Sequence, residues 1–320
     1  MSLLVERVSK TFTKVQAVND LSMQVKQGEI FGFLGPNGAG KTTTIRMILD
    51  IIRPDAGQIS WNGKPVTEVS RRAWGYLPEE RGLYPKMAVD EQLIFLARLY
   101  GMPKARVERD LTEWLERFEI SQNRKKKVEE LSKGNQQKIQ FLATILHDPD
   151  ILIMDEPFSG LDPLNVNLLK NAFLEMHRRG KTIIFSTHQM ETVEELCEDI
   201  AIINKGQIVV SGSLREVKRS SGRTIIRLAL DNDLTIGWLD QIAGVAVSKR
   251  RQDYIEMELH APATPDLILQ TALRQGGHIT RFEVVEPSLN DIFIERVGGL
   301  PTNSEPDPAE EPAIVTQRQS

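Results

Sequence analysis

The chain has 320 residues, of which 40% are hydrophobic and 26% are charged, and its formal net charge at pH 7 is -4. These values are ordinary for a soluble protein with one large and one small domain, and the weakly acidic charge gives no reason to expect nucleic acid as a partner. The single cysteine, Cys197, excludes an internal disulfide and a cysteine-rich metal site, which fits a reducing cytosol.

The sequence contains no candidate transmembrane segment. No apolar run approaches the roughly 18 to 20 residues that cross a bilayer. The chain begins with the strand-like residues Leu3, Leu4 and Val5, which leaves no room for a signal peptide. We therefore expect a cytoplasmic protein, and any role at a membrane must pass through a partner.

Residues 3–8 and 18–25 form short apolar runs broken by polar residues, which predicts antiparallel strands beside a main sheet. Phe12 lies between these runs, in a turn at residues 10–15. Its aromatic ring could stack on a purine or could cap the small sheet. The residues alone leave both interpretations open.

A phosphate-binding loop is predicted after the apolar strand at residues 30–34. The segment GPNGAGKT, residues 35–42, matches the pattern GxxxxGK[ST] and precedes a helical run. Backbone N–H groups of such a loop and the start of its helix hold polyphosphate. Lys41 would reach the β- and γ-phosphates, and the Thr42 hydroxyl would bind Mg²⁺. The predicted nucleotide-binding residues are Gly35, Pro36, Asn37, Gly38, Ala39, Gly40, Lys41, Thr42 and Thr43.

The middle of the chain changes from strands to helices. Strands are predicted at 58–61 and 74–77, and the period of the apolar residues becomes helical from residue 89 to residue 120. A further helix is predicted at 135–147. We expect these helices to form an all-helical insertion at about residues 86–148 within an α/β domain.

Two apolar runs, 151–154 and 182–185, are typical of parallel strands buried on both faces. Each ends in polar residues, and ligands of such sheets bind at the carboxyl ends of the strands. Asp155 would hold Mg²⁺, and Glu156 would polarise the water that attacks the γ-phosphate. His188 would donate to the γ-phosphate or steady Glu156. A crossover helix at 163–179 and a hairpin at 200–211 complete a domain that we place at 1–217.

Residues 220–299 predict a second domain with the order βαββαβ, which resembles a ferredoxin-like unit. Its helices are expected at 234–242 and 264–275, and a last helix at 288–297. An interaction or regulatory module is the default interpretation. The tail, 300–320, has too little apolar surface to fold, so we expect it to be disordered. The predicted fold class is α/β, a phosphate-loop NTPase with a mixed sheet, an antiparallel subdomain and a helical insertion, followed by a small α+β domain.

Several motifs together resemble the ATP-binding cassette ATPases. In the order of that family, the chain contains GPNGAGKT (35–42), LSKGN (131–135), ILIMDEP (151–157), SGLD (159–162) and STH (186–188). The resemblance covers residues 3–217. It implies an ATP hydrolase that uses ATP and Mg²⁺.

The resemblance also implies a homodimer in which two copies meet head to tail and enclose ATP between them. Ser132 and Gly134 would complete the site of the opposite copy, because the start of a helix favours a γ-phosphate. Asp162 would contact the other protomer. Phe12 would be the aromatic residue that stacks on adenine.

Two departures from the family pattern bear on the site. The signature usually reads LSGGQ, and here Lys133 and Asn135 replace glycine and glutamine. The glutamine of the lid loop aligns with Glu79, whose carboxylate can bind Mg²⁺ but cannot donate a hydrogen bond as an amide does. Because the signature keeps Ser132 and Gly134, we expect it to function with altered nucleotide affinity.

The segment 286–293 resembles bacterial exporter ATPases that pair with separately encoded membrane subunits, as in sodium, drug and antibiotic efflux. This resemblance predicts an exporter subunit that lies peripherally on the inner face of the cell membrane and binds an integral membrane permease. An alternative is a soluble cassette ATPase that acts on ribosomes or DNA. Such proteins usually fuse two cassettes or contain long coiled coils, and this chain shows neither feature. A third alternative, a regulatory module that hardly hydrolyses ATP, is disfavoured by Glu156.

Overall fold

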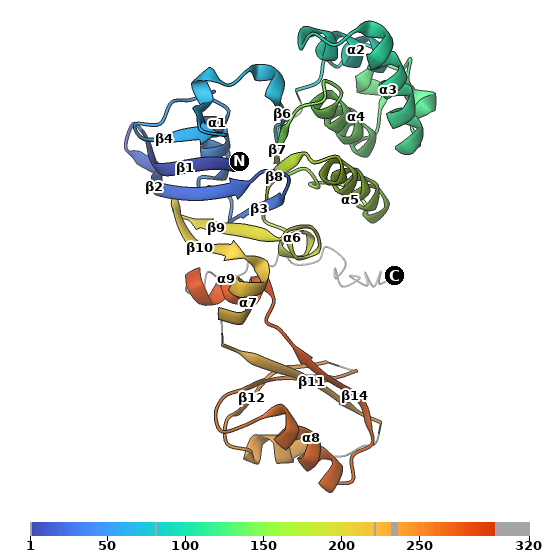
Figure 1. Ribbon diagram of the computed structural model, residues 1–320. Coiled ribbons are helices and arrows are strands. Elements are labelled where there is room, and N and C mark those ends of the chain that lie inside the picture. Colours follow the sequence, from blue (N-terminus) through green and yellow to red (C-terminus); the bar gives the residue numbers. More distant parts are fainter. Residues whose placement is uncertain (1, 81, 221, 232–235, 252, 298–320) are drawn as a thin grey trace, which may run out of the picture.

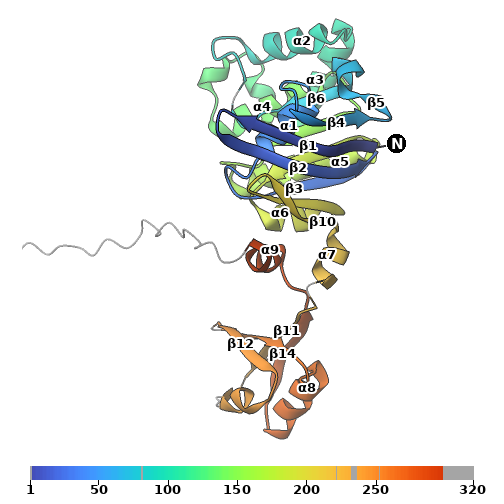
Figure 2. The ribbon, with the colours of Figure 1, turned by 90° about the vertical axis from the view of Figure 1, so that its left-hand side faces the viewer.

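The computed structural model describes residues 2–80, 82–220, 222–231, 236–251 and 253–297. The described chain forms a large mixed α/β body and a smaller domain that hangs below it (Figures 1 and 2). The predicted disordered tail, 300–320, lies outside the described residues. None of the described helices is both long and apolar enough to span a membrane.

The main sheet has six strands in the order β10-β9-β3-β8-β7-β6. Strands β3, β6, β7, β8 and β9 run parallel, and β10 pairs antiparallel with β9. The central strands are completely buried, because helices cover one face of the sheet, and α1 and a second sheet cover the other. The bounds are β3 Ile30–Leu34, β6 Trp74–Leu77, β7 Ile151–Asp155, β8 Thr182–Thr187, β9 Asp199–Asn204 and β10 Gln207–Ser213, with helices α1 Lys41–Ile48, α5 Pro163–Arg178 and α6 Met190–Leu196.

A second, antiparallel sheet has the order β2-β1-β4-β5. It comprises β1 Ser2–Phe12, β2 Val15–Lys26, β4 Ala56–Trp61 and β5 Lys64–Pro65. Its apolar side chains share a core cluster with α1 and with one face of the main sheet. The strands are longer than the apolar runs that predicted them, and Phe12 is the last residue of β1 rather than part of the turn.

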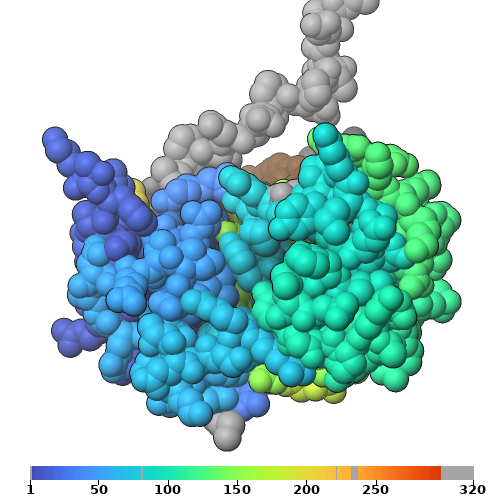
Figure 3. Space-filling model, turned by 90° about the horizontal axis from the view of Figure 1, so that it is seen from above, coloured from blue at the N-terminus to red at the C-terminus, as the bar shows by residue number. Residues whose placement is uncertain are grey.

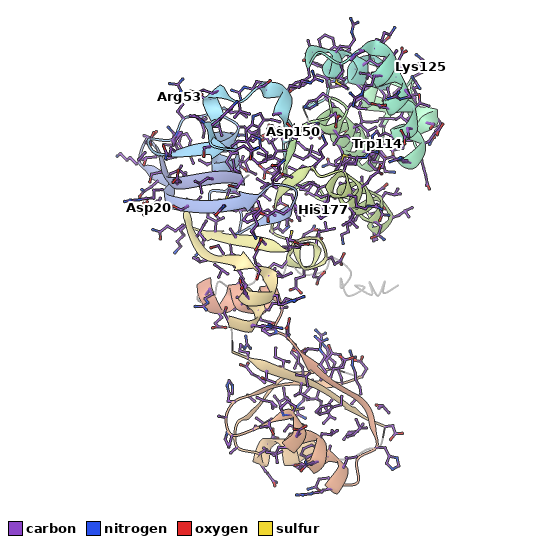
Figure 4. The ribbon with its side chains drawn as sticks, viewed as in Figure 1. Asp20, Arg53, Trp114, Lys125, Asp150 and His177 are labelled. Carbon is purple, nitrogen blue, oxygen red and sulfur yellow. The ribbon has the colours of Figure 1, made fainter. Side chains whose placement is uncertain are left out.

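The helical insertion consists of α2 Val89–Leu99, α3 Lys104–Arg117 and α4 Lys133–Ile145. It lies beside the N-terminal sheet region when the molecule is seen from above (Figure 3). Trp114 of α3, labelled in Figure 4, packs edge-on against Phe141 of α4 at a ring distance of 6.4 Å. Phe141 stacks in turn on Phe173 of α5. This aromatic chain joins the insertion to the core of the α/β body.

The smaller domain contains β11 Thr224–Leu230, β12 Val245–Arg250, β13 Ile255–Leu259, α8 Pro265–Arg274 and β14 Ile279–Val285. Its four strands pair antiparallel in the order β12-β13-β11-β14, which is the ferredoxin-like arrangement. The predicted α-helix at 234–242 is instead a 3₁₀ segment, Ile236–Gln241, and its first two positions lie outside the described residues. The fold class predicted from the sequence is confirmed.

Helix α7, Leu214–Ser220, leads out of the large body, and α9, Leu289–Val297, returns to it (Figures 1 and 2). Leu289 and Ile292 of α9 are 0% and 2% exposed and belong to the apolar core that includes α6. The sequence order groups α9 with the smaller domain. Its packing places it on the large one.

Candidate functional site

The phosphate loop connects β3 to α1 and depends on glycine at two close approaches. Gly40 has a φ of 109°, and a Cβ there would lie 2.5 Å from the carbonyl oxygen of Ala17. A Cβ on Gly35 would lie 2.3 Å from the carbonyl oxygen of Ile203. Both distances are far below contact distance, so a side chain at either position would displace the loop. The neighbouring strands therefore fix the loop against the sheet.

The start of α1 presents free amides. The N–H of Thr44 donates to the carbonyl of Gly40 at 3.0 Å, which is the first i to i−4 bond of the helix. The amides of Lys41, Thr42 and Thr43 precede that bond and have no partner within the helix. Together with the positive end of the helix dipole, they form a place for an anion.

Lys41 is buried at the base of the loop. Its Nζ donates to the carbonyl oxygens of Gly35 and Pro36, at 2.7 and 3.3 Å. It also lies 3.8 Å from Oε1 of Glu156. The ammonium group is thus held on the loop itself, at the position where a bound polyphosphate would meet a positive charge.

Thr42 and Asp155 meet across the gap between α1 and the end of β7. The Thr42 hydroxyl donates to Oδ2 of Asp155 at 2.6 Å. The Ser186 hydroxyl, at the end of β8, donates to the other carboxylate oxygen of Asp155. Asp155 is 1% exposed, so these bonds replace the water that a buried carboxylate needs.

Glu156 follows β7 in a left-handed conformation, with a φ of 49°. Such a φ is uncommon outside glycine, and the surrounding bonds hold the residue in it. Its N–H donates to the carbonyl of Ser186 at 3.0 Å, and its Oε2 accepts from the Thr187 hydroxyl at 3.1 Å. Its Oε1 lies 2.9 Å from Nδ1 of His188. The carboxylate is therefore held by Thr187, the last residue of the adjacent strand β8, and by His188, the residue after it.

Lys41, Thr42, Asp155 and Glu156 line one cavity of about 300 Å³. The pKa of the Tyr76 hydroxyl on β6 is raised by burial and by the negative charge of Asp155. Glu79 belongs to the cavity wall but is exposed. The lining residues are Ala17, Pro36, Asn37, Gly38, Gly40, Lys41, Thr42, Thr43, Glu79, Asp155 and Glu156.

The remaining predicted site residues lie elsewhere. Ser132 caps α4 by accepting from the Asn135 N–H at 3.3 Å, and it is exposed. Gly134 faces Asn165, whose Nδ2 would lie 3.0 Å from a Cβ at that glycine. Asp162 caps α5 by accepting from the N–H of Asn165 at 3.0 Å, a bond that lowers the pKa of Asp162. These residues form a second group, and none of them lines the cavity.

Phe12 also lies outside the cavity wall. Its ring is 45% exposed, and Nζ of Lys10 lies over it at 5.7 Å from the centroid. An exposed aromatic residue at the end of a strand is compatible with stacking on a base.

Four polar residues complete the site but were absent from the predicted set. Ser186 and Thr187 bond to the two carboxylates, and their position at the end of a buried strand was the available signal. Gln137 and Gln140 of α4 are both buried. Gln137 donates to the carbonyl of Pro157 at 3.0 Å, and Gln140 donates to the carbonyls of Pro78 and Glu80, which flank Glu79. No sequence pattern pointed to these two glutamines.

The donors at Thr42 and Asp155 are hard oxygen atoms, which suit Mg²⁺. The described residues contain no group of three His, Cys, Asp or Glu side chains that could hold a metal alone. A divalent cation at this place would therefore take other ligands from water or from the phosphates of a nucleotide.

Comparison with known proteins places these features in a family. Residues 18–159 match the ABC transporter family, and residues 212–297 match the C-terminal domain of DrrA1-3-like ATP-binding proteins. An uncharacterized ABC transporter ATP-binding protein of Bacillus subtilis, YhaQ, is 50% identical over 93% of this chain and 99% of its own length.

A second relative of the same organism, the linearmycin resistance ATP-binding protein LnrL, is 31% identical over 92% of this chain and 98% of its own length. A solved structure described as the ATP-binding subunit of an ABC transporter shares 33% identity and a TM-score of 0.65. It covers 69% of this chain and 94% of that chain. With its phosphate loop and paired carboxylates, the chain belongs to the ATP-binding, ATP-hydrolysing subunits of ABC transporters.

Proposed function

We propose that this protein is the motor subunit of an ABC exporter, that two copies close head to tail around ATP and Mg²⁺, and that closure drives a separate membrane permease. The observation that carries the proposal is the separation of two groups of residues. The cavity holds the phosphate loop and the carboxylates, and the start of α4 lies apart from it.

The start of α4 suits a phosphate that comes from outside its own chain. Ser132 and Lys133 are exposed, and the first amides of α4 have no carbonyl partner within the helix, although the Asn135 N–H is capped by Ser132. A helix start of this kind binds an anion such as a γ-phosphate. Head-to-tail closure would bring it against the phosphate loop of a second copy.

The carboxylates divide the chemistry between them. Glu156, which is 6% exposed, would accept the proton of the attacking water, and the bond from His188 would keep it aimed at the γ-phosphate. Lys41 and the loop amides would stabilise the negative charge that develops on the phosphate oxygens. In-line attack by this water gives ADP and inorganic phosphate.

Thr42 and Asp155 would hold Mg²⁺, with Glu79 as a further oxygen ligand from the lid loop. The cation, when bound, would neutralise charge on the β- and γ-phosphates. The bonds of Gln140 to the two carbonyls that flank Glu79 fix the backbone of this loop, while the Glu79 side chain remains exposed. An exposed carboxylate on a fixed loop at the cavity wall can bind a cation that enters with the nucleotide.

The dimer can be tested with Glu156→Gln, which keeps the shape of the side chain but removes its basicity. We expect turnover to fall at least about 100-fold, while ATP binding persists and a dimer accumulates with ATP and Mg²⁺. Multi-angle light scattering after gel filtration measures the mass. Glu195→Gln, on the exposed side of α6, is the matched control. A variant that stays monomeric at saturating ATP contradicts the sandwich.

The export direction is supported by the relative named for linearmycin resistance and by the DrrA-like match at residues 212–297. We expect the protein to lie on the inner face of the cell membrane, bound to an integral permease. Affinity purification from membranes should recover such a protein, and transport of a toxic compound out of the cell should require Glu156. Recovery of ribosomal RNA or DNA instead would favour a soluble ATPase without a transport role.

A further inference from the structure

Glu194 of α6 bonds to both segments that connect the C-terminal domain. Its Oε1 accepts a hydrogen bond from the N–H of Leu289, the first residue of α9, at 2.6 Å. Its Oε2 lies 2.5 Å from Nζ of Lys218 on α7. Helix α7 leads into β11, and α9 follows β14. One carboxylate therefore joins the exit and the return of the chain.

Helix α6 depends on these contacts for its position. It spans only seven residues, Met190–Leu196, and a helix of that length is not stable without tertiary packing. Val193 and Leu196 are buried in the same apolar core as Leu289 and Ile292 of α9. The bond from Leu289 to Glu194 thus fixes α6 in register with α9 as well as in contact with it.

The other end of α6 begins at the catalytic carboxylate. The Thr187 hydroxyl donates to Glu156 at 3.1 Å and accepts from the N–H of Gln189 at 3.0 Å, immediately before the helix. His188, between them, contacts Glu156. A continuous path of bonds and one rigid helix therefore connects Glu156 to Glu194.

The space beside this path also joins the two regions. A cavity of about 370 Å³ is lined by His188, by residues of α6, and by Ser288 and Asn290 of the α9 start. Ser288 caps α9 through mutual bonds with Asp291, at 2.6 and 3.2 Å between the Ser288 side chain and that residue. The capped start of α9 and His188 therefore line the same cavity.

We propose that Glu194 is a positioning residue for ATP hydrolysis. It anchors α6 to the two connections of the C-terminal domain, and through α6 it holds His188 and Thr187 against Glu156. The C-terminal domain thereby acts on the rate of hydrolysis in its own chain. This inference rests on the proposed roles of Glu156 and His188.

The first test is Glu194→Ala. We expect kcat for ATP hydrolysis to fall roughly 5- to 20-fold, since a misaimed proton acceptor loses part of the 10²–10⁴-fold that general base catalysis supplies. KM and the Kd for ATP should change less than about twofold, because the phosphate loop is untouched. Glu195→Gln is the matched control: it is the adjacent residue, it pairs with Lys170 of α5, and its side chain is 60% exposed. It should leave kcat unchanged.

A double-mutant cycle distinguishes positioning from general loss of stability. His188→Ala alone should lower kcat, and adding Glu194→Ala should then lower kcat by a smaller factor than it does in the wild type, because part of its effect passes through the contact of His188 with Glu156. Multiplicative losses overturn the inference while leaving the role of His188 intact. An unchanged kcat in His188→Ala overturns that proposed role, and this inference with it.

Two milder variants cover the case in which Glu194→Ala does not fold. Glu194→Gln can still accept from Leu289 but loses the charge pair, and Lys218→Met removes the pair from the other side. Both should lower kcat by the same factor, smaller than that of the alanine variant, with thermal unfolding temperatures close to wild type. Wild-type kcat in both, in folded protein, overturns the inference.

Discussion

The residues that line the phosphate-loop cavity and the residues at the start of α4 differ in the hydrogen-bond partners of their polar atoms. Lys41, Asp155 and Glu156 are nearly inaccessible, and their hydrogen bonds are made to the phosphate loop, to Thr42 and to the end of β8, respectively. Ser132, Lys133 and Asp162 are exposed, and Ser132 and Asp162 accept hydrogen bonds from their own helices as caps. The cavity residues are buried and bonded within one chain, whereas the start of α4 is exposed to solvent. This difference suits a ligand that two molecules bind together.

Gly134→Asp is the variant with the largest expected effect, and it tests whether the start of α4 takes part in ATP hydrolysis. The new side chain would begin 3.0 Å from Nδ2 of Asn165 and would place a negative charge where the γ-phosphate of a second copy is expected. We expect turnover to fall at least about 100-fold, as when one donor to a developing oxyanion is removed. Dimer formation should be lost, while the monomer still binds ATP.

The matched control is Gly237→Asp in the smaller domain, where an added Cβ meets nothing within 4 Å. It should hydrolyse ATP at the wild-type rate. Equal turnover in Gly134→Asp and wild type, measured by phosphate release, would mean that the start of α4 takes no part in catalysis.

Lys41→Ala changes the cavity instead of the start of α4, and we expect it to weaken ATP binding by the monomer. ATP affinity should fall roughly 10- to 100-fold, because a charged hydrogen bond to phosphate contributes about 1.5–3 kcal/mol. Isothermal calorimetry on the monomer measures the Kd. Lys138→Ala is the control, since this lysine is equally buried but donates to the carbonyl of Phe118. It should reduce stability and leave the Kd unchanged. Unaltered ATP affinity in Lys41→Ala would remove the phosphate role of this residue.

Asp162→Ala should have a smaller effect on both stability and assembly. Losing the cap of α5 costs about 1 kcal/mol of unfolding free energy. It also frees Asn165, which lies against Gly134, so we expect weaker dimerisation. Thr264→Ala removes the comparable cap of α8 and should destabilise the protein without changing the dimer. Sedimentation with ATP measures the dimer affinity of both variants. If Asp162→Ala and Thr264→Ala dimerise with the same affinity, Asp162 lies outside the interface.

The smallest effect concerns Glu29, a buried carboxyl at the opposite edge of the sheet. Burial raises its pKa to about 7 from an ordinary value of 4.5, despite the bond that it accepts from the Lys26 N–H at 2.6 Å. The folded protein therefore binds the proton more tightly than the unfolded chain. The stabilisation is complete below about pH 4.5 and is lost as the pH rises through 7.

Glu29→Gln removes this titration and keeps an acceptor for Lys26. At pH 5 its unfolding free energy should match wild type, and at pH 8 it should exceed wild type by the order of 1 kcal/mol. Urea denaturation at both pH values measures the difference, and ATP affinity should not change. A difference that is the same at pH 5 and pH 8 would rule out the protonation of Glu29 in the folded protein.

The sequence by itself determined the phosphate loop, the buried parallel strands and the family. These features are local: a glycine-rich turn between an apolar strand and a helix needs only neighbouring residues to be recognised. The order βαββαβ was equally readable, because each element shows its own apolar period. It predicted the ferredoxin-like sheet, although the 3₁₀ segment Ile236–Gln241 stands where an α-helix was expected.

Only the tertiary structure decided which polar side chains meet. Ser186 and Thr187 bond to Asp155 and Glu156 because β7 and β8 are adjacent in the sheet, and the glutamines of α4 reach carbonyls far away in the chain. The return of α9 to α6 follows from the burial of Leu289 and Ile292 in a core that other segments build. Such contacts depend on how distant elements pack, and a pattern within one segment does not contain that information.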